Sequence, residues 1–170
     1  MSANNEKDRL KALYEGWLIT NGMAITRPVN ASVYSETIYN HPSGSGISII
    51  QLNDGSDKII ITTRVNLGQD VQQLIGAMDI NGQRSFTNGM ATALMQIGAQ
   101  FNIQHANNTV QFISVERTLF GEGLTKQIFF DNLFTVVSGA ILVVMRLQDR
   151  FGMQTGKTPG GGTGSSPGIR

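Results

Sequence analysis

The fold is decided by one stretch of the sequence, FNIQHANNTVQFISVERTLFGEGLTKQIFFDNLFTVVSGAILVVMRL, which runs from Phe101 to Leu147. Its first part predicts a β-hairpin, because Phe101–His105 and Thr109–Arg117 are strand-like runs separated by turn-forming residues. Thr125 then favours the start of a helix, since its hydroxyl can accept an amide hydrogen bond from the first helical turn. The long, strongly apolar helix that follows indicates a sheet with one face to be covered.

The rest of the chain extends this pattern toward the N-terminus. Apolar residues at helical spacing predict a first helix over residues 5–21. Turn residues separate three further strand-like runs, and two helical segments follow, with Asn81-Gly82 expected to interrupt the helical region. The strands are expected over 32–39, 47–52 and 58–65, and the helices over 70–78 and 84–98.

These elements predict an α+β fold. We expect an antiparallel sheet of about five strands with helices packed on it, in the order α-βββ-α-ββ-α. Residues 1–151 are expected to form a single domain. Residues 152–170 are rich in Gly, Ser, Thr and Pro and cannot bury enough apolar surface to offset ordering entropy, so they are expected to be a flexible tail.

The composition excludes several classes of function. The net charge is +1 and no run of Lys or Arg occurs, so a nucleic-acid partner is not expected. The chain has no cysteine, which removes disulfides, thiolate nucleophiles and cysteine-ligated metals. The polar N-terminus lacks the apolar core of a signal peptide, so a cytoplasmic protein is expected.

A membrane span is not expected in the last helix. The uncharged run Leu133–Met145 is only 13 residues long, whereas a spanning helix needs about 20 apolar residues. Asp131 and Arg146 bracket this run. The sequence therefore favours a helix that is buried, or half-buried at a subunit interface.

Candidate catalytic residues are few. His41 and His105 are the only histidines, and both fall in predicted turns or strand ends. No acid lies at helical spacing to either one, so no metal or cofactor is expected, and the simplest interpretation is two surface histidines. An enzyme that uses His41 or His105 with a carboxylate stays as an alternative.

Apolar residues beyond the needs of one core suggest protein binding. Ile50 and Ile60 lie on the strand faces opposite to their core-facing neighbours, where they could meet a client segment. Trp17 and Tyr34 are further candidates for the same role. We expect a self-association surface at three further residues, Met90, Leu94 and Phe101.

The segment Leu119–Leu133, with the step Gly121-Glu-Gly-Leu-Thr125 into the last helix, carries a family resemblance. Together with the order of elements over about residues 5–150, it resembles the class I type III secretion chaperones and the wider superfamily of small chaperone-like proteins. The resemblance implies a homodimer formed by the second helix and the neighbouring hairpin. It also implies that client segments bind apolar patches on the sheet and first helix, without enzymatic activity.

The leading hypothesis is therefore a non-enzymatic, chaperone-like domain that self-associates and binds protein segments. The alternative of a structural or assembly protein of a virus or filament rests on the low charge content and the Gly-rich tail.

Overall fold

The computed structural model describes every residue except 1–2, 43, 45, 108 and 153–170, so the expected tail, Gly152 apart, lies outside the described residues. The helices are α1 (Ala3–Thr20), α2 (Gln69–Gly76), α3 (Ile80–Gln96) and α4 (Lys126–Phe151). The strands are β1 (Ile25–Thr26), β2 (Ser35–Asn40), β3 (Gly46–Gln51), β4 (Lys58–Asn66), β5 (Gln100–Ala106) and β6 (Thr109–Phe120).

The strands form one antiparallel sheet in the order β1-β2-β3-β4-β6-β5. This confirms the predicted α+β class and the predicted order of elements. The expectation of about five strands is corrected, because the described residues form six. The additional strand, β1, pairs only Ile25 with Tyr39 and Thr26 with Ile38. Two residues are too few to carry a period-2 pattern, so the sequence gives no signal for this strand.

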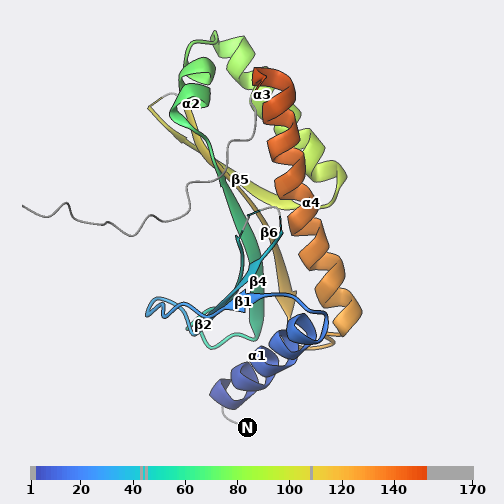
Figure 1. Ribbon diagram of the computed structural model, residues 1–170. Coiled ribbons are helices and arrows are strands. Elements are labelled where there is room, and N and C mark those ends of the chain that lie inside the picture. Colours follow the sequence, from blue (N-terminus) through green and yellow to red (C-terminus); the bar gives the residue numbers. More distant parts are fainter. Residues whose placement is uncertain (1–2, 43, 45, 108, 153–170) are drawn as a thin grey trace, which may run out of the picture.

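The helices cover one face of the sheet and leave the other open. Figure 1 shows the sheet nearly edge-on, with α1, α3 and α4 on the same side. The strand residues that point toward these helices are buried, as the cross-strand pair Ile49 and Ile61 shows. The covered face is therefore the hydrophobic core of the domain.

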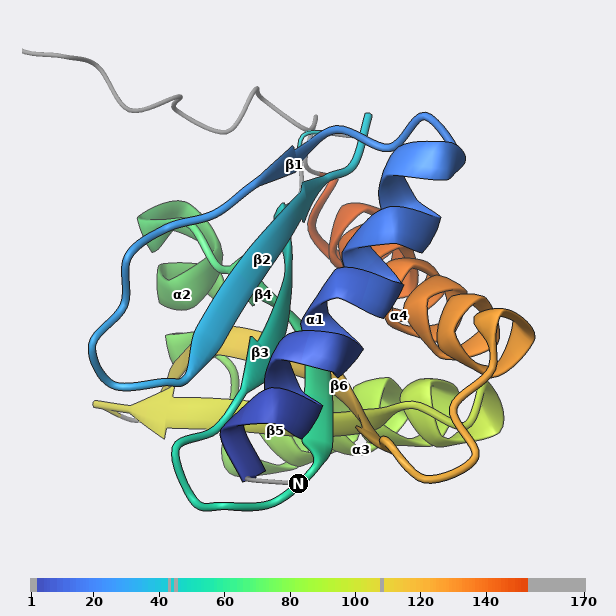
Figure 2. The same ribbon diagram turned by 90° about the horizontal axis from the view of Figure 1, so that it is seen from below.

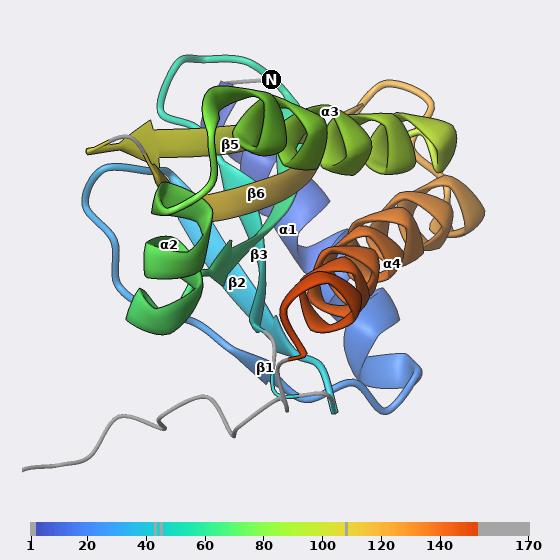
Figure 3. The same ribbon diagram turned by 90° about the horizontal axis from the view of Figure 1, so that it is seen from above.

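The core divides into two clusters along α4. The first joins α1 to the N-terminal half of α4, and Figure 2 shows these two segments packed beside each other. The second joins α2, α3 and the C-terminal half of α4, and Figure 3 shows α3 over β5 with α4 beside it. The first cluster includes Leu10, Tyr14, Phe129 and Leu133. The second includes Val71, Phe86, Leu94, Ile113 and Val143.

The ends of the helices follow from their capping residues. The Thr125 hydroxyl accepts a hydrogen bond of 3.2 Å from the Ile128 amide, which confirms the predicted start of α4. The predicted interruption at Asn81-Gly82 is wrong. The Asp79 carboxylate accepts a hydrogen bond of 2.6 Å from the Gly82 amide, so Asn81-Gly82 forms part of the first turn of α3.

Candidate protein-binding surfaces

The open face of the sheet carries a row of apolar side chains. Ile50 of β3 and Ile60 of β4 are directly opposite each other in the register. Ile38 of β2 lies one diagonal step from Ile50, and Phe120 of β6 lies one diagonal step from Ile60. The three isoleucines are half-buried and Phe120 is 55% exposed. We call these four residues the open-face row.

Polar groups border this row. The Glu36 carboxylate accepts hydrogen bonds from the Ser48 hydroxyl at 2.9 Å and from the Asn30 side-chain amide at 3.0 Å. Farther along the same face, the Arg64 guanidinium lies 4.1 Å from the centre of the Phe112 ring. The loop of residues 27–34 projects on this side of the sheet (Figure 1), and it carries the fully exposed side chain of Val29.

Tyr34 lies where the start of β2 meets α1. Its hydroxyl donates a hydrogen bond of 2.9 Å to Asp8 of α1, and the Lys7 ammonium lies 5.0 Å from its ring centre. The hydrogen bond to Asp8 raises the pKa of the Tyr34 hydroxyl. Trp17 packs against Phe129 of α4, with ring centres 5.7 Å apart. These two of the four predicted client-binding residues are half-buried and already anchor α1 to its neighbours.

A polar network fixes α1 against β2. The Glu15 carboxylate accepts hydrogen bonds from the Arg27 guanidinium at 2.9 Å and from the Thr37 hydroxyl at 2.6 Å. Burial raises the pKa of Glu15, but the hydrogen bonds from Arg27 and Thr37 outweigh it, so the net pKa lies below the ordinary value. The Glu15 carboxylate is therefore held in its charged form, although the residue is buried on α1.

The predicted self-association residues do not form a surface. Met90 and Leu94 are 2% and 0% exposed and pack in the core beneath α3, and Phe101 is half-buried against the same cluster. A partner could not reach Met90 or Leu94 without rearrangement of α3. The apolar stripe that suggested an interface is the stripe by which α3 packs on its own chain. On α3, the exposed large apolar residues are Ile80 and Met95, each at 60%.

An exposed apolar stripe does occur on the outer face of α4. Phe134, Ile141 and Met145 are 50%, 42% and 55% exposed, and the exposed Ser138 lies between them. The spacing of these four residues places them on one side of the helix. We call them the α4 stripe. The predicted half-buried helix is therefore found, with its outer side apolar.

By length and composition alone, α4 is also the one described helix that could cross a membrane, with a mean hydropathy of 2.0 over its best window. Of that window, 39% is buried inside the domain. The core helix of a soluble protein meets the same criterion, and the contacts of α4 with the sheet are of that kind.

The histidines lie far apart. His41 follows β2 with its ring edge-on to Tyr39, whereas His105 is exposed at the end of β5, the opposite edge strand of the sheet. Neither histidine lines either of the two cavities described. Within the part of the chain that the structure describes, no group of three or more metal-ligating side chains occurs.

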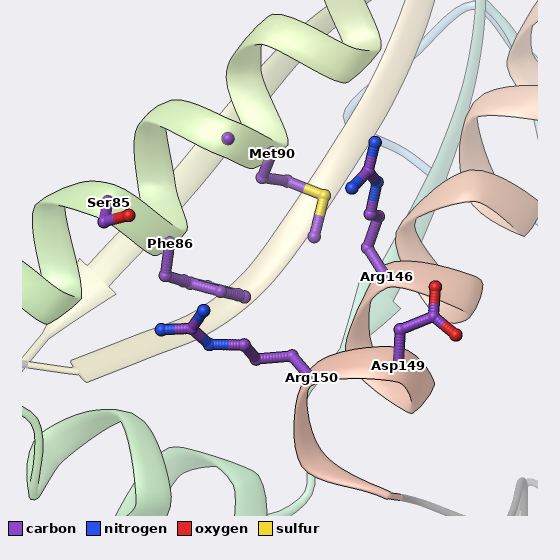
Figure 4. Close-up of a pocket in the computed structure, with 7 residues that line it drawn as sticks. Ser85, Phe86, Met90, Arg146, Asp149 and Arg150 are labelled. Atoms are coloured by element: carbon purple, nitrogen blue, oxygen red, sulfur yellow. The ribbon is translucent and has the colours of Figure 1, made fainter.

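A cleft that the sequence pattern does not predict lies between α3 and α4. Its volume is about 210 Å³. Residues 85–90 of α3 and the last turns of α4 form its walls, as Figure 4 shows. Its signal in the sequence is the i, i+4 spacing of Arg146 and Arg150, which has no meaning until α3 is known to pack alongside. The lining residues are Ser85, Phe86, Gly89, Met90, Arg146, Asp149 and Arg150.

Known structures share this fold. An uncharacterized protein from Methanothermobacter thermautotrophicus matches with a TM-score of 0.76 and 22% identity, over 83% of this chain and 98% of that one. The ExsC-ExsE complex matches with a TM-score of 0.51 and 14% identity, over 82% of this chain and 92% of that one. The expected resemblance to chaperone-like proteins is thus supported at the level of fold. No curated protein matches the sequence.

The sequence itself shows the family. Residues 10–147 match the family described as "Uncharacterized conserved protein (DUF2299)", and this match spans α1 to the end of α4. The chain therefore belongs to the DUF2299 family of conserved proteins.

Proposed function

We propose that this protein binds an extended segment of another protein chain on the open face of its sheet. The observation that carries the proposal is the open-face row, four apolar side chains from four adjacent strands on a face that no helix of the described chain covers. The role is non-enzymatic and, as expected from the sequence, cytoplasmic.

The geometry of the row suggests how a segment docks. Neighbouring strands lie about 4.8 Å apart, so a row across four strands extends for about 15 Å. An extended chain advances about 3.3 Å per residue, and alternate side chains point the same way. Two or three alternate apolar side chains of the segment would therefore cover the row. The segment would dock onto the face of the sheet and would not add a strand at its edge.

The groups around the row suit a bound protein chain, because they include both polar and apolar contacts. Glu36 and its hydrogen-bonding partners Ser48 and Asn30 flank the row with groups that can bond a peptide backbone. The loop of residues 27–34 extends on the same side and offers Val29 as a further apolar contact. The likeness in fold to a structure described as a complex, that of ExsC and ExsE, is consistent with a protein partner.

Self-association is the second part of the proposal, and we place it at the α4 stripe. The spacing of Phe134, Ser138, Ile141 and Met145 is four, three and four residues, which reads the same in both directions. Two antiparallel copies of α4 would then bring each Phe134 opposite the other copy's Met145, and each Ser138 opposite Ile141. A twofold axis requires such a self-complementary surface.

The test of segment binding uses a double variant of the row. Ile50→Thr with Ile60→Thr removes apolar surface but keeps β-branched side chains, so the strands should persist. Labelled peptides of alternating Val and Thr are titrated by fluorescence anisotropy. We expect the wild type to bind and the double variant to lose at least about tenfold in affinity.

Met95→Thr is the control, because Met95 is an exposed apolar residue that lies on α3, away from the open-face row. Its affinity should equal that of the wild type. Thermal unfolding of all three proteins checks that the fold is intact. Equal binding by the double variant and the wild type would exclude the open-face row as the site, and so would a lack of binding by every alternating peptide tested.

A further inference from the structure

The cleft between α3 and α4 holds two arginines without partners. Arg146 and Arg150 lie one turn apart on α4, and among the described residues neither guanidinium forms an ion pair or a hydrogen bond. Other arginines of the chain are engaged, as with Arg27 on Glu15 and Arg117 on Asn132 and the Gly98 carbonyl. In Figure 4 the two guanidinium groups point to different sides of the cleft mouth, Arg150 toward Phe86 and Arg146 past Met90, and an unpaired guanidinium group at the mouth of a cavity is suited to an anion.

The charge of the cleft favours an anion of one unit. Asp149 lines the same cleft, so the two arginines and one carboxylate give a net charge of +1. In Figure 4, Arg150 extends from α4 toward Ser85 and Phe86, while Asp149 stands on the side of Arg146 that is away from α3. One bound carboxylate would balance this net charge, whereas a phosphate dianion would exceed it and meet the repulsion of Asp149.

The interior of the cleft is apolar and small. Phe86 and Met90 form the floor and are 7% and 2% exposed, so only their edges are accessible. Gly89 forms part of the α3 wall, and a Cβ atom built on it would meet nothing within 4 Å. The volume of about 210 Å³ is below the range of about 300–1,000 Å³ that encloses drug-sized ligands. A ligand with one carboxylate and a compact apolar body fits these features.

We propose that this cleft binds a monocarboxylate attached to an apolar or aromatic group, with the carboxylate on Arg150, Arg146 adding positive charge at the other side of the mouth, and the apolar group over Phe86 and Met90. The Ser85 hydroxyl, at the rim, can donate a further hydrogen bond. This site is separate from the open-face row, and its existence does not depend on segment binding there.

The experiment uses phenylacetate as the probe and phenylacetamide as its neutral counterpart. Each is titrated into the ¹⁵N-labelled full chain, and amide chemical shifts are followed by NMR at low ionic strength. We expect phenylacetate to shift the resonances of residues 85–90 and 146–150, and phenylacetamide to bind at least about tenfold more weakly. Equal binding of the two compounds would overturn the proposal.

Two variants test the site itself. Arg146→Gln with Arg150→Gln removes the positive charges, and Gly89→Leu adds a side chain to the wall of the cleft at a position where a Cβ atom meets nothing within 4 Å. Both should lose at least about tenfold in affinity for phenylacetate. Because leucine favours a helix over glycine, Gly89→Leu should also keep or raise the melting temperature, so that lost binding cannot be ascribed to unfolding.

Arg84→Gln is the control, because Arg84 is exposed on α3 but does not line the cleft. It should bind phenylacetate as the wild type does. A similar loss in Arg84→Gln would show general electrostatic attraction and overturn the site. A peptide that ends in a phenylalanine carboxylate distinguishes the source of the ligand. Tighter binding than phenylacetate indicates a protein terminus, and weaker binding indicates a small metabolite, while both retain the carboxylate site.

Discussion

Gly139 of α4 lies against Val115 of β6 so closely that a Cβ atom built on Gly139 would come within 2.6 Å of Val115 Cγ1. It would also come within 3.5 Å of Leu94 Cδ2 on α3. The absence of a side chain at this position therefore lets α4 approach the sheet at the point where the three elements meet. The packing of α4 on the covered face of the sheet depends on this contact.

Replacement of Gly139 by alanine should destabilise the protein. Val115 is buried and β-branched, so it cannot turn aside easily. Strain from overpacking of about 1–3 kcal/mol should exceed the helix-propensity gain of about 1 kcal/mol, for a net loss of up to about 2 kcal/mol. Urea denaturation measures this free energy of unfolding.

Gly89→Ala is the matched control, because a Cβ atom there meets nothing within 4 Å. The same substitution on α3 should raise the free energy of unfolding by about 0.5–1 kcal/mol. If both variants shift stability in the same direction, the close approach of α4 to Val115 does not control the packing.

The hydrogen bonds of Glu15 should make stability depend on pH. Glu15→Gln keeps the shape of the side chain but weakens its bonds to Arg27 and Thr37. We expect a loss of about 1–3 kcal/mol in the free energy of unfolding at pH 7. The control is Glu6→Gln, which breaks an exposed pair with Arg9 and should change stability little.

The direction of the pH effect follows from the lowered pKa of Glu15. A carboxyl group of this kind stabilises the folded state fully above its unfolded pKa, about 4.3, and loses this contribution as the pH falls through the folded pKa. The difference between the wild type and Glu15→Gln should therefore be constant near pH 7 and shrink below about pH 4.3. A difference that grows in acid would contradict the assignment of Glu15 as the charged partner of Arg27.

Particular residues show what the sequence could predict. The helical stripe from Leu10 to Leu18 and the alternation in residues 58–65 correspond to α1 and β4, because each period is repeated often enough to identify the element. The same alternation placed Ile50 and Ile60 away from the core. The sequence could not add Ile38 and Phe120 to the row, because the diagonal steps between strands depend on register.

The stripe through Met90 and Leu94 shows a different limit. Periodicity identifies the apolar face of a helix but does not say whether that face meets its own chain or a second one. Here α4 and the sheet cover it, so both residues are buried. The cleft with Arg146 and Arg150 was missed for a related reason, since it forms only when α3 and α4 lie side by side.

Removal of the Thr125 hydroxyl should weaken the start of α4. Thr125→Ala deletes the acceptor for the Ile128 amide, and loss of such a cap costs about 1 kcal/mol. Thr125→Ser keeps the hydroxyl and should retain most of the stability. Urea denaturation should rank the wild type and the serine variant together above the alanine variant, and equal stability of all three would show that the cap is not used.

The α4 stripe should control the oligomeric state. Phe134→Asp places a charge at the end of the proposed contact, opposite Met145 of the other copy, where it would be buried without a partner. Light scattering at about 100 µM, well above the micromolar dissociation constant of a typical weak dimer, should give the mass of two chains for the wild type and of one chain for Phe134→Asp. Met95→Asp, an exposed apolar position on α3, is the control and should stay dimeric.

Disulfide formation gives a separate test of the antiparallel arrangement. The chain contains no cysteine of its own, so only the introduced thiols can react. The proposed pairing places Ser138 of one copy opposite Ile141 of the other. A mixture of Ser138→Cys and Ile141→Cys chains should therefore form mixed disulfides faster than either variant forms its own. In a parallel pair, each thiol would instead face its own equivalent, and the single variants would react faster than the mixture. That second result, or a wild type with the mass of one chain, would move self-association away from the α4 stripe while leaving the open-face row untouched.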